Sequence, residues 1–364
     1  ALSALTTSAR NVAIGTQALN GAMATNSNTY NVAVGYQAGT AVTTGVQNTL
    51  IGGVAGTALT SGVSNVALGY AALFTSVDGD NNTAIGYAAL LAYEDGDGNG
   101  HNTAVGASSQ SAATTGEFNT SLGSLSMGAG VTTGDYNVAI GYQAGQALTS
   151  GSENIVIGQG AGDALTTGTR NVAIGHAALS AEDANGYNTA IGRSALNALN
   201  AGADGYNVAV GYSAGAVMTT GVRNTVIGAI AGDAMTTGTD NTIVGERSGS
   251  AQTIASFNTS LGENSLFTNV ASSNNTAIGV NALMAMTSAT AANGFNVAVG
   301  NTAGGAVTSG VQNTLLGYQA GNAITTGDNN IIIGNNAAAS AVGADNETVI
   351  GTATTTNAIV HGLR

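Results

Sequence analysis

Residues 154–168 read NIVIGQGAGDALTTG and look like the start of a nucleotide-binding site. An apolar run, Ile155–Ile157, precedes Gly158, Gly160 and Gly162, and such glycines often hold a phosphate with their backbone amides. A dinucleotide fingerprint needs G-x-G-x-x-G before a long helix, with an acidic residue about 20 positions later. Here the spacing is G-x-G-x-G, a turn signal follows within a few residues, and the phrase NVAIG recurs 17 residues away on both sides. We therefore interpret this stretch as one copy of a repeat.

A second stretch, EDGDGNGHN, contains residues typical of a calcium loop. Asp95, Asp97, Asn99 and Gly100 match the start of the pattern D-x-D-x-N-G. The twelfth position is Gly106, where a calcium loop has a bidentate Glu. We expect a solvated loop that absorbs an insertion, with Ca²⁺ at Asp95, Asp97 and Asn99 as the alternative, which EDTA would test by lowering the melting temperature. No other metal and no cofactor is expected.

Residues typical of catalysis do not gather in the sequence. The three histidines, His101, His176 and His361, lie far apart, and no Ser-His-Asp set or carboxylate pair recurs near them. We expect no catalytic residue and no enzyme. Seven aromatic residues directly precede a repeated Asn and are interpreted as covering a corner of the fold, with sugar stacking as the alternative: Tyr30, Phe118, Tyr136, Tyr187, Tyr206, Phe257 and Phe295.

The composition excludes several classes of partner. The 364 residues include 55 Gly, no Pro, no Cys and no Lys, and only 7% are charged, against about 25% in ordinary domains. The net charge of −13 argues against binding to nucleic acid and to anionic membrane surfaces. No apolar run approaches the roughly 18 residues of a membrane span, so no membrane insertion is expected. The first residues do not form a signal peptide, and the abrupt start suggests a fragment or a processed chain.

A repeat of 17 residues organises nearly the whole chain. Its motif is Asn-β-x-β-Gly, where β is Val, Ile, Leu or Thr, and we number the Asn as position 1. Fourteen of the 19 intervals are 17 residues, and the other five are 18 to 21. We predict a partial coil or cap over 1–10, one continuous array over 11–351, and a cap or transition to a neck over 352–364. The 20 copies begin at residues 11, 31, 48, 65, 82, 102, 119, 137, 154, 171, 188, 207, 224, 241, 258, 275, 296, 313, 330 and 347.

The repeat predicts an all-β fold, a parallel β-solenoid of about 20 coils. Positions 2 and 4 favour extended backbone and share one face, whereas position 3 points to the other. A Gly at position 5 and another shortly before the next Asn would make two corners, which leaves room for two short strands per coil, with one short helical turn left open. Stacked coils would align the Asn residues in a ladder. The structural residues that we predict are Asn11, Gly15, Asn31, Gly35, Asn137, Gly141, Asn171, Gly175, Asn313 and Gly317.

Apolar or small residues occupy both faces of the predicted strand. A thin coil has one interior and can bury only one of these faces. We expect the other face to be buried against further copies of the chain, in a parallel homotrimer, with the rows of Ala suited to close packing about a shared axis.

The phrases NVAIGYQAG, NTAIGYAAL and NVAVGYSAG resemble the head repeats of trimeric autotransporter adhesins, the YadA-like left-handed parallel β-roll, and related repeats of bacteriophage tail fibres. The resemblance covers residues 11–351, although those heads use shorter coils. It implies a non-enzymatic extracellular adhesin or fibre shaft on a cell or virion surface. Surface glycans or a host-cell receptor would be its partners.

Two other functions fit a solenoid of this composition. Stacked TTG turns would form rows of Thr that match ordered water, as in an ice- or surface-binding protein. Uncapped ends would instead allow coils of successive molecules to stack into a structural filament.

Overall fold

The computed structural model describes residues 10–21, 28–94, 99–287 and 293–352. The chain divides into two compact units, residues 1–186 and 187–364, and each is described by itself. Most of the predicted terminal segments, 1–10 and 352–364, lie outside the described residues. Within the described residues all regular structure is β-strand, so the prediction of an all-β parallel solenoid is confirmed.

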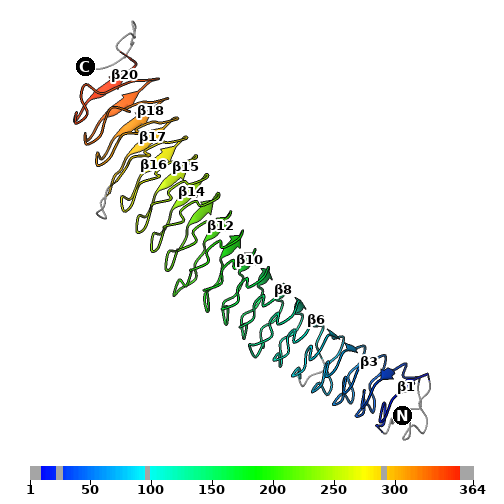
Figure 1. Ribbon diagram of the computed structural model, residues 1–364. Coiled ribbons are helices and arrows are strands. Elements are labelled where there is room, and N and C mark those ends of the chain that lie inside the picture. The colour runs from blue at the N-terminus through cyan, green and yellow to red at the C-terminus, as the bar shows by residue number, and fades with distance from the viewer. Residues whose placement is uncertain (1–9, 22–27, 95–98, 288–292, 353–364) are drawn as a thin grey trace. The chain divides into compact units, whose positions relative to one another are not determined.

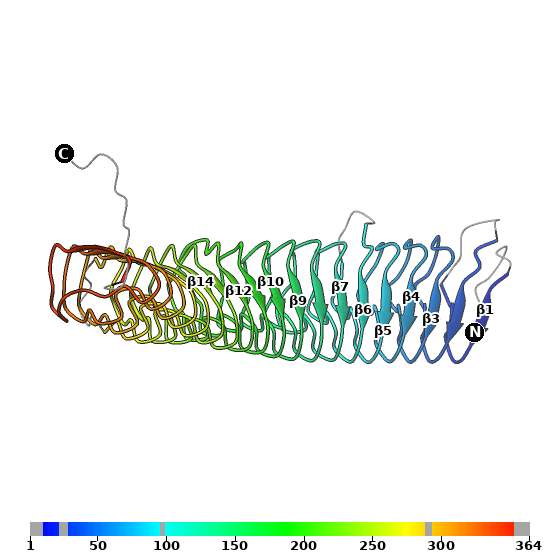
Figure 2. The ribbon, with the colours of Figure 1, turned by 90° about the horizontal axis from the view of Figure 1, so that it is seen from above.

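The described residues of the first unit contain ten strands of three residues, one in each coil, and successive strands pair in parallel with identical register. Figure 1 shows them side by side, and Figure 2 shows the labelled strands of this unit along one side of the coils. The strands are β1 (Val12–Ile14), β2 (Val32–Val34), β3 (Thr49–Ile51), β4 (Val66–Leu68), β5 (Thr83–Ile85), β6 (Thr103–Val105), β7 (Thr120–Leu122), β8 (Val138–Ile140), β9 (Ile155–Ile157) and β10 (Val172–Ile174).

The second unit repeats this arrangement with ten further strands, again parallel and in register. They are β11 (Thr189–Ile191), β12 (Val208–Val210), β13 (Thr225–Ile227), β14 (Thr242–Val244), β15 (Thr259–Leu261), β16 (Thr276–Ile278), β17 (Val297–Val299), β18 (Thr314–Leu316), β19 (Ile331–Ile333) and β20 (Thr348–Ile350).

The middle residue of each strand, position 3, points into the coil. It is buried in every strand except β1 and β20, where it is half-buried, whereas positions 2 and 4 are half-buried or exposed throughout. Position 8, mostly Ala, is also buried and packs in the same interior with the larger side chains of positions 9 and 12. The rows of Ala that we assigned to contact between chains therefore line the coil interior, and the outward rows are aliphatic or Thr.

The prediction of two strands per coil is wrong, and the described residues contain no helical turn either. The reason is a regular series of residues with positive φ at positions 0, 5, 7 and 9 of the coils. At position 7 these include Val54, Ile230 and Thr302, residue types that rarely adopt the left-handed region. A left-handed residue every second position turns the chain too often for a second strand or for a helix.

Glycine at position 5 is required for two reasons. The predicted corner residues Gly15, Gly35, Gly141, Gly175 and Gly317 have φ between 121° and 139°. A Cβ on Gly141 would also lie 2.7 Å from the carbonyl oxygen of Gly158 in the next coil. The second Gly of the repeat has an ordinary φ and is needed for close approach alone: a Cβ on Gly45 would lie 2.5 Å from Gly62 O.

Candidate interaction surface

The predicted Asn ladder is confirmed, and it closes each coil while joining it to its neighbours. Asn137 Oδ1 accepts the backbone N–H of Asn154 at 3.0 Å. Asn137 Nδ2 donates to Gly151 O of its own coil at 2.9 Å and to Asn119 Oδ1 of the preceding coil at 3.1 Å. From Asn31 to Asn330 each ladder residue is at most 1% exposed. The polar atoms of these residues are therefore committed to the fold, apart from Nδ2 of Asn82, which is buried without a hydrogen-bond partner among the described residues, and they do not form a binding site.

The other predicted ladder residues make bonds of the same kind. Asn11, Asn31 and Asn313 accept the backbone N–H of the next ladder residue at 2.8 to 3.0 Å. Asn171 Nδ2 donates to the corner carbonyl of Asn185 at 3.0 Å. The Asn series ends at Glu347, whose carboxylate accepts the backbone N–H and the hydroxyl of Ser340, and these hydrogen bonds lower the pKa of Glu347.

The outward side chains of positions 2 and 4 form one continuous surface in each unit, which we call the sheet face. Position 4 is Ile, Val or Leu in all 20 copies, and position 2 is Val, Ile or Thr. No charged residue occurs at either position. Leu68, Leu122 and Leu316 are 42 to 47% exposed, although aliphatic side chains of this size are usually buried.

Positions 0 and 6 border the sheet face on its two sides, and we call them its rims. Of the described large apolar residues that are exposed, all but five lie on the sheet face or its rims. The exceptions are Val77, Val131, Val217, Ile254 and Val342. The apolar surface of each unit is therefore gathered on one side, which is the usual mark of an interaction surface.

Aromatic rings on the rims stack on one another from coil to coil. Phe118 lies between His101 and Tyr136, with ring centroids 5.0 and 5.1 Å apart and nearly parallel planes. Tyr187 stacks on Tyr206 at 5.0 Å in the same way. Inside such a stack each ring covers the face of its neighbour and leaves its edge to solvent, which favours the corner-covering interpretation over sugar stacking for these residues.

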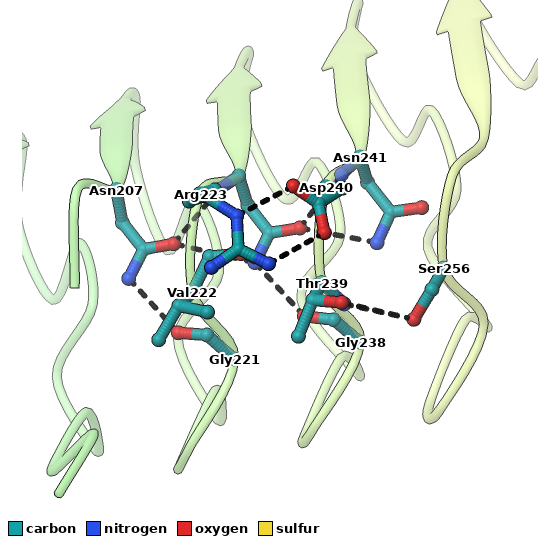
Figure 3. A network of polar contacts seen from close by, with 10 residues as sticks. Asn207, Gly221, Val222, Arg223, Gly238, Thr239, Asp240, Asn241 and Ser256 are labelled. Carbon is teal, nitrogen blue, oxygen red and sulfur yellow. Dashed lines mark hydrogen bonds and ion pairs between the residues drawn. The ribbon is translucent and has the colours of Figure 1, made fainter. Parts of the chain in front are cut away.

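Charged rim residues of adjacent coils form ion pairs. Arg170 contacts Glu153 with Nε–Oε2 at 2.9 Å, and Arg223 contacts Asp240 with Nε–Oδ1 at 2.7 Å. Figure 3 shows the second pair beside the Asn ladder. The hydrogen bond and the charge of the Arg lower the pKa of Glu153, and the bond to Arg223 lowers that of Asp240. We did not anticipate these pairs from the sequence, although opposite charges 17 residues apart at position 0 are the signal that would have found them.

The first Thr of the TTG and TSG turns is engaged with the fold. The hydroxyls of Thr149, Thr166 and Thr236 donate to carbonyl oxygens of the following coil at 3.0, 2.7 and 3.1 Å. A hydroxyl that donates to its own protein is not free to order surface water by donation. The second Thr of these turns, such as Thr167 and Thr237, is exposed, and among the described residues its hydroxyl has no hydrogen-bond partner, so this row is still open to water.

The nucleotide-site lookalike is a regular coil. The amides of Gly158, Gly160 and Gly162 donate to carbonyl oxygens of neighbouring coils at 2.8, 3.0 and 2.9 Å. A phosphate would need these same N–H groups. Asp163 follows directly, and burial raises the pKa of its carboxyl. The interpretation of this stretch as a repeat copy is confirmed.

The proposed calcium ligands Asp95 and Asp97 lie outside the described residues. Asn99 is described, and its carbonyl oxygen accepts from the Tyr93 hydroxyl at 3.3 Å. Within the described ranges, no group of three or more His, Cys, Asp or Glu is placed to hold a metal ion. His176 lies alone at a rim position, and His361 is not described.

Comparison of the sequence with models of known protein families, and with curated proteins, finds no match. In the described part of the chain, no helix has the length and apolar character of a membrane crossing.

Proposed function

We propose that the chain is a non-enzymatic extracellular fibrous protein, an adhesin head or a fibre shaft on a cell or virion surface, that mediates attachment to a surface glycan or a host receptor. The observation that carries the proposal is the sheet face, which has an aliphatic residue at position 4 of every coil and no charged residue at position 2 or 4. An ordinary monomer leaves few apolar patches of this kind open to water. The resemblance of the repeats to trimeric adhesin heads supports the same function.

In this proposal three parallel copies bury their sheet faces about a common axis. Parallel copies in register bring equivalent coils together, so that Ile, Val and Leu of position 4 contact the same residue types. The acidic residues lie on the rims and elsewhere outside the sheet face, and a net charge of −13 disfavours contact through those other surfaces. The face is continuous over ten strands in each unit, so many weak apolar contacts would add up.

The test is the molar mass in solution, measured by light scattering. We expect three times the chain mass of 35.1 kDa. Leu122→Arg places a charge on the sheet face and should lower this mass, whereas Val131→Arg is the matched control, because Val131 is similarly exposed but lies away from the face. A monomeric parent chain, or equal effects of the two variants, would contradict the proposal.

Binding to ice or to another ordered surface is the second candidate, and the sheet face offers a further row of Thr for it. Four successive strands carry Thr at position 2, namely Thr225, Thr242, Thr259 and Thr276. Among the described residues, none of these hydroxyls has a hydrogen-bond partner in the protein. A monomer in light scattering, together with inhibition of ice growth that Thr242→Leu weakens, would favour this function. A broad distribution of very large masses would instead favour the end-to-end filament.

A further inference from the structure

Five tripeptides match the acceptor pattern of N-linked glycosylation, Asn-x-Ser or Asn-x-Thr. They begin at Asn81, Asn119, Asn258, Asn274 and Asn346. Two of them begin at position 1 of a coil and three begin at position 0, whose residues all have a positive φ, so the two sets present their side chains differently. The structure therefore sorts the five into two groups according to whether the Asn side chain faces the coil interior or the solvent.

Two of the tripeptides point into the coil. Asn119 and Asn258 belong to the Asn ladder and are each 1% exposed. Their Nδ2 atoms donate to corner carbonyls at 2.9 Å. The serines of these tripeptides, Ser121 and Ser260, are fully buried. Neither tripeptide can meet an enzyme while the coil is folded.

The other three tripeptides point outward from the rim at position 0. Asn81 and Asn346 are exposed, and among the described residues their side-chain amides have no hydrogen-bond partner. Asn274 is half-buried, and its Nδ2 donates to Asn293 Oδ1 at 2.7 Å. In each case the Thr two residues later is at position 2, on the sheet face, and is half-buried or exposed.

We propose that Asn81, Asn274 and Asn346 are acceptors for an N-linked sugar. The donor is an activated sugar, a hexose joined through its anomeric carbon to a nucleoside diphosphate. Asn Nδ2 attacks the anomeric carbon, so a C–N bond forms and the bond from that carbon to the phosphate oxygen breaks. The nucleoside diphosphate leaves, and the amide proton passes to a base of the transferring enzyme, so nothing is oxidised or reduced.

This inference rests on the proposed extracellular role, in which sugars on the outer surface add hydration and protection from proteases. A glycan on Asn81 needs open solvent beside the sheet face. If the rim carries glycans, position 0 must therefore lie at the border of the proposed trimer contact and not inside it. The neighbouring coils carry Ser64 and His101 at the same position, and neither side chain covers the space above Asn81 with a long apolar group.

The experiment treats the folded, purified chain with a soluble N-glycosyltransferase that uses UDP-glucose, and reads the intact mass and the modified peptides. We expect hexose on Asn81 and Asn346, more slowly on Asn274 because its amide is engaged, and none on Asn119 or Asn258. Thr83→Val should abolish modification of Asn81 without harming the fold, since position 2 is Val in the neighbouring strand β4. Ile331→Thr should create a new acceptor at Asn329, which occupies the same rim.

Two results would overturn the inference: a folded chain that takes no sugar, or sugar on Asn119 and Asn258 as fast as on the rim. The readout requires neither assembly nor attachment. A monomer that carries sugar on the rim would therefore refute the proposed trimer and leave this inference standing, and a trimer without sugar would do the reverse.

Discussion

Two adjacent residues of each coil, positions 0 and 1, face the same corner and are constrained very differently. Position 1 is Asn in 19 of 20 copies, is buried, and bonds to its own coil and to its neighbours. Position 0 holds nine residue types, among them Tyr, Phe, Arg, Glu and Asn, yet its φ lies between 49° and 63° in every copy.

The difference shows that the backbone conformation of this corner does not select the side chain. A left-handed φ is accepted by Phe and Arg at position 0, where the side chain is free to leave the coil. At position 1 the side chain must supply a donor and an acceptor at fixed places, and only Asn has both at this length. At this corner, hydrogen bonding, more than backbone strain, therefore determines which residue the repeat keeps.

The largest effect on stability is expected from a substitution at position 1, the buried Asn of the ladder. Asn154→Ala leaves Gly168 O and the Asn171 N–H buried without their partner, and should lower the free energy of unfolding by about 4 kcal/mol. Urea unfolding followed by circular dichroism measures the loss. The control is Glu153→Ala one residue earlier, which should cost far less. Equal losses for the two variants would refute the contrast between the positions.

The next largest effect concerns two glycines of the same coil. A Cβ on Gly158 would lie 2.6 Å from Gly175 O, so Gly158→Ala should cost about 3 kcal/mol. Gly160 has φ 59° and no atom closer than 3.9 Å to such a Cβ, and Gln143 adopts the same φ at the equivalent place. Gly160→Ala meets no close atom and should cost only about 1 kcal/mol, the strain of a left-handed Ala, in the same unfolding assay. A neutral Gly158→Ala would show that the coils can move apart at this corner.

A smaller effect on stability is expected from the stacked aromatic rings at position 0. Phe118→Ala removes stacking on two neighbours and should cost about 1 kcal/mol in thermal or urea unfolding. Phe257 occupies the same position but has no stacked ring among the described residues, so Phe257→Ala should cost less. If both variants lose equally, the stacks contribute nothing beyond the burial of each ring.

The smallest effect is the pH dependence of a rim ion pair. Arg170 lowers the pKa of Glu153 in the folded chain, so the pair stabilises the fold above the ordinary pKa of a Glu. This contribution is lost as the pH falls through the lowered pKa, when the carboxylate takes up a proton. The melting temperature of the parent should therefore fall slightly more on acidification than that of Arg170→Gln. The opposite order would mean that Arg170 does not stabilise the charged form.

Much of the fold could be predicted from the sequence because the same motif occurs in 20 copies, so the residue types that each position requires can be read from their comparison. The strands, the corner at Gly141 and the ladder through Asn137 each follow from one residue type at one position. The number of strands per coil could not be predicted, because left-handed residues such as Val54 and Ile230 contradict their own local preferences. Contacts with neighbouring coils determine those conformations, and no single copy of the repeat reveals them.

The interaction surface was predicted only in part. An apolar strand has two faces, and composition alone did not say whether Ala33 or Val34 points inward. Ala takes the interior in many strands, whereas the larger Leu50 and Leu315 lie inside where Gly at position 9 leaves room for them. The ion pair of Glu153 with Arg170 was missed because the two residues are ordinary in isolation and meaningful only as members of one column.

The Asn ladder also determines how such a chain can change its length. Each ladder residue bonds only to its own coil and to the coils on either side. Deletion of the 17 residues 154–170 would place Asn171 next to Asn137, so one Asn would still bond to another. Deletion of a single residue from a strand would instead turn inward side chains outward. The length of such a solenoid can therefore change only in steps of one coil. Recombination that adds or removes whole coils changes the length and keeps the contacts between neighbouring coils.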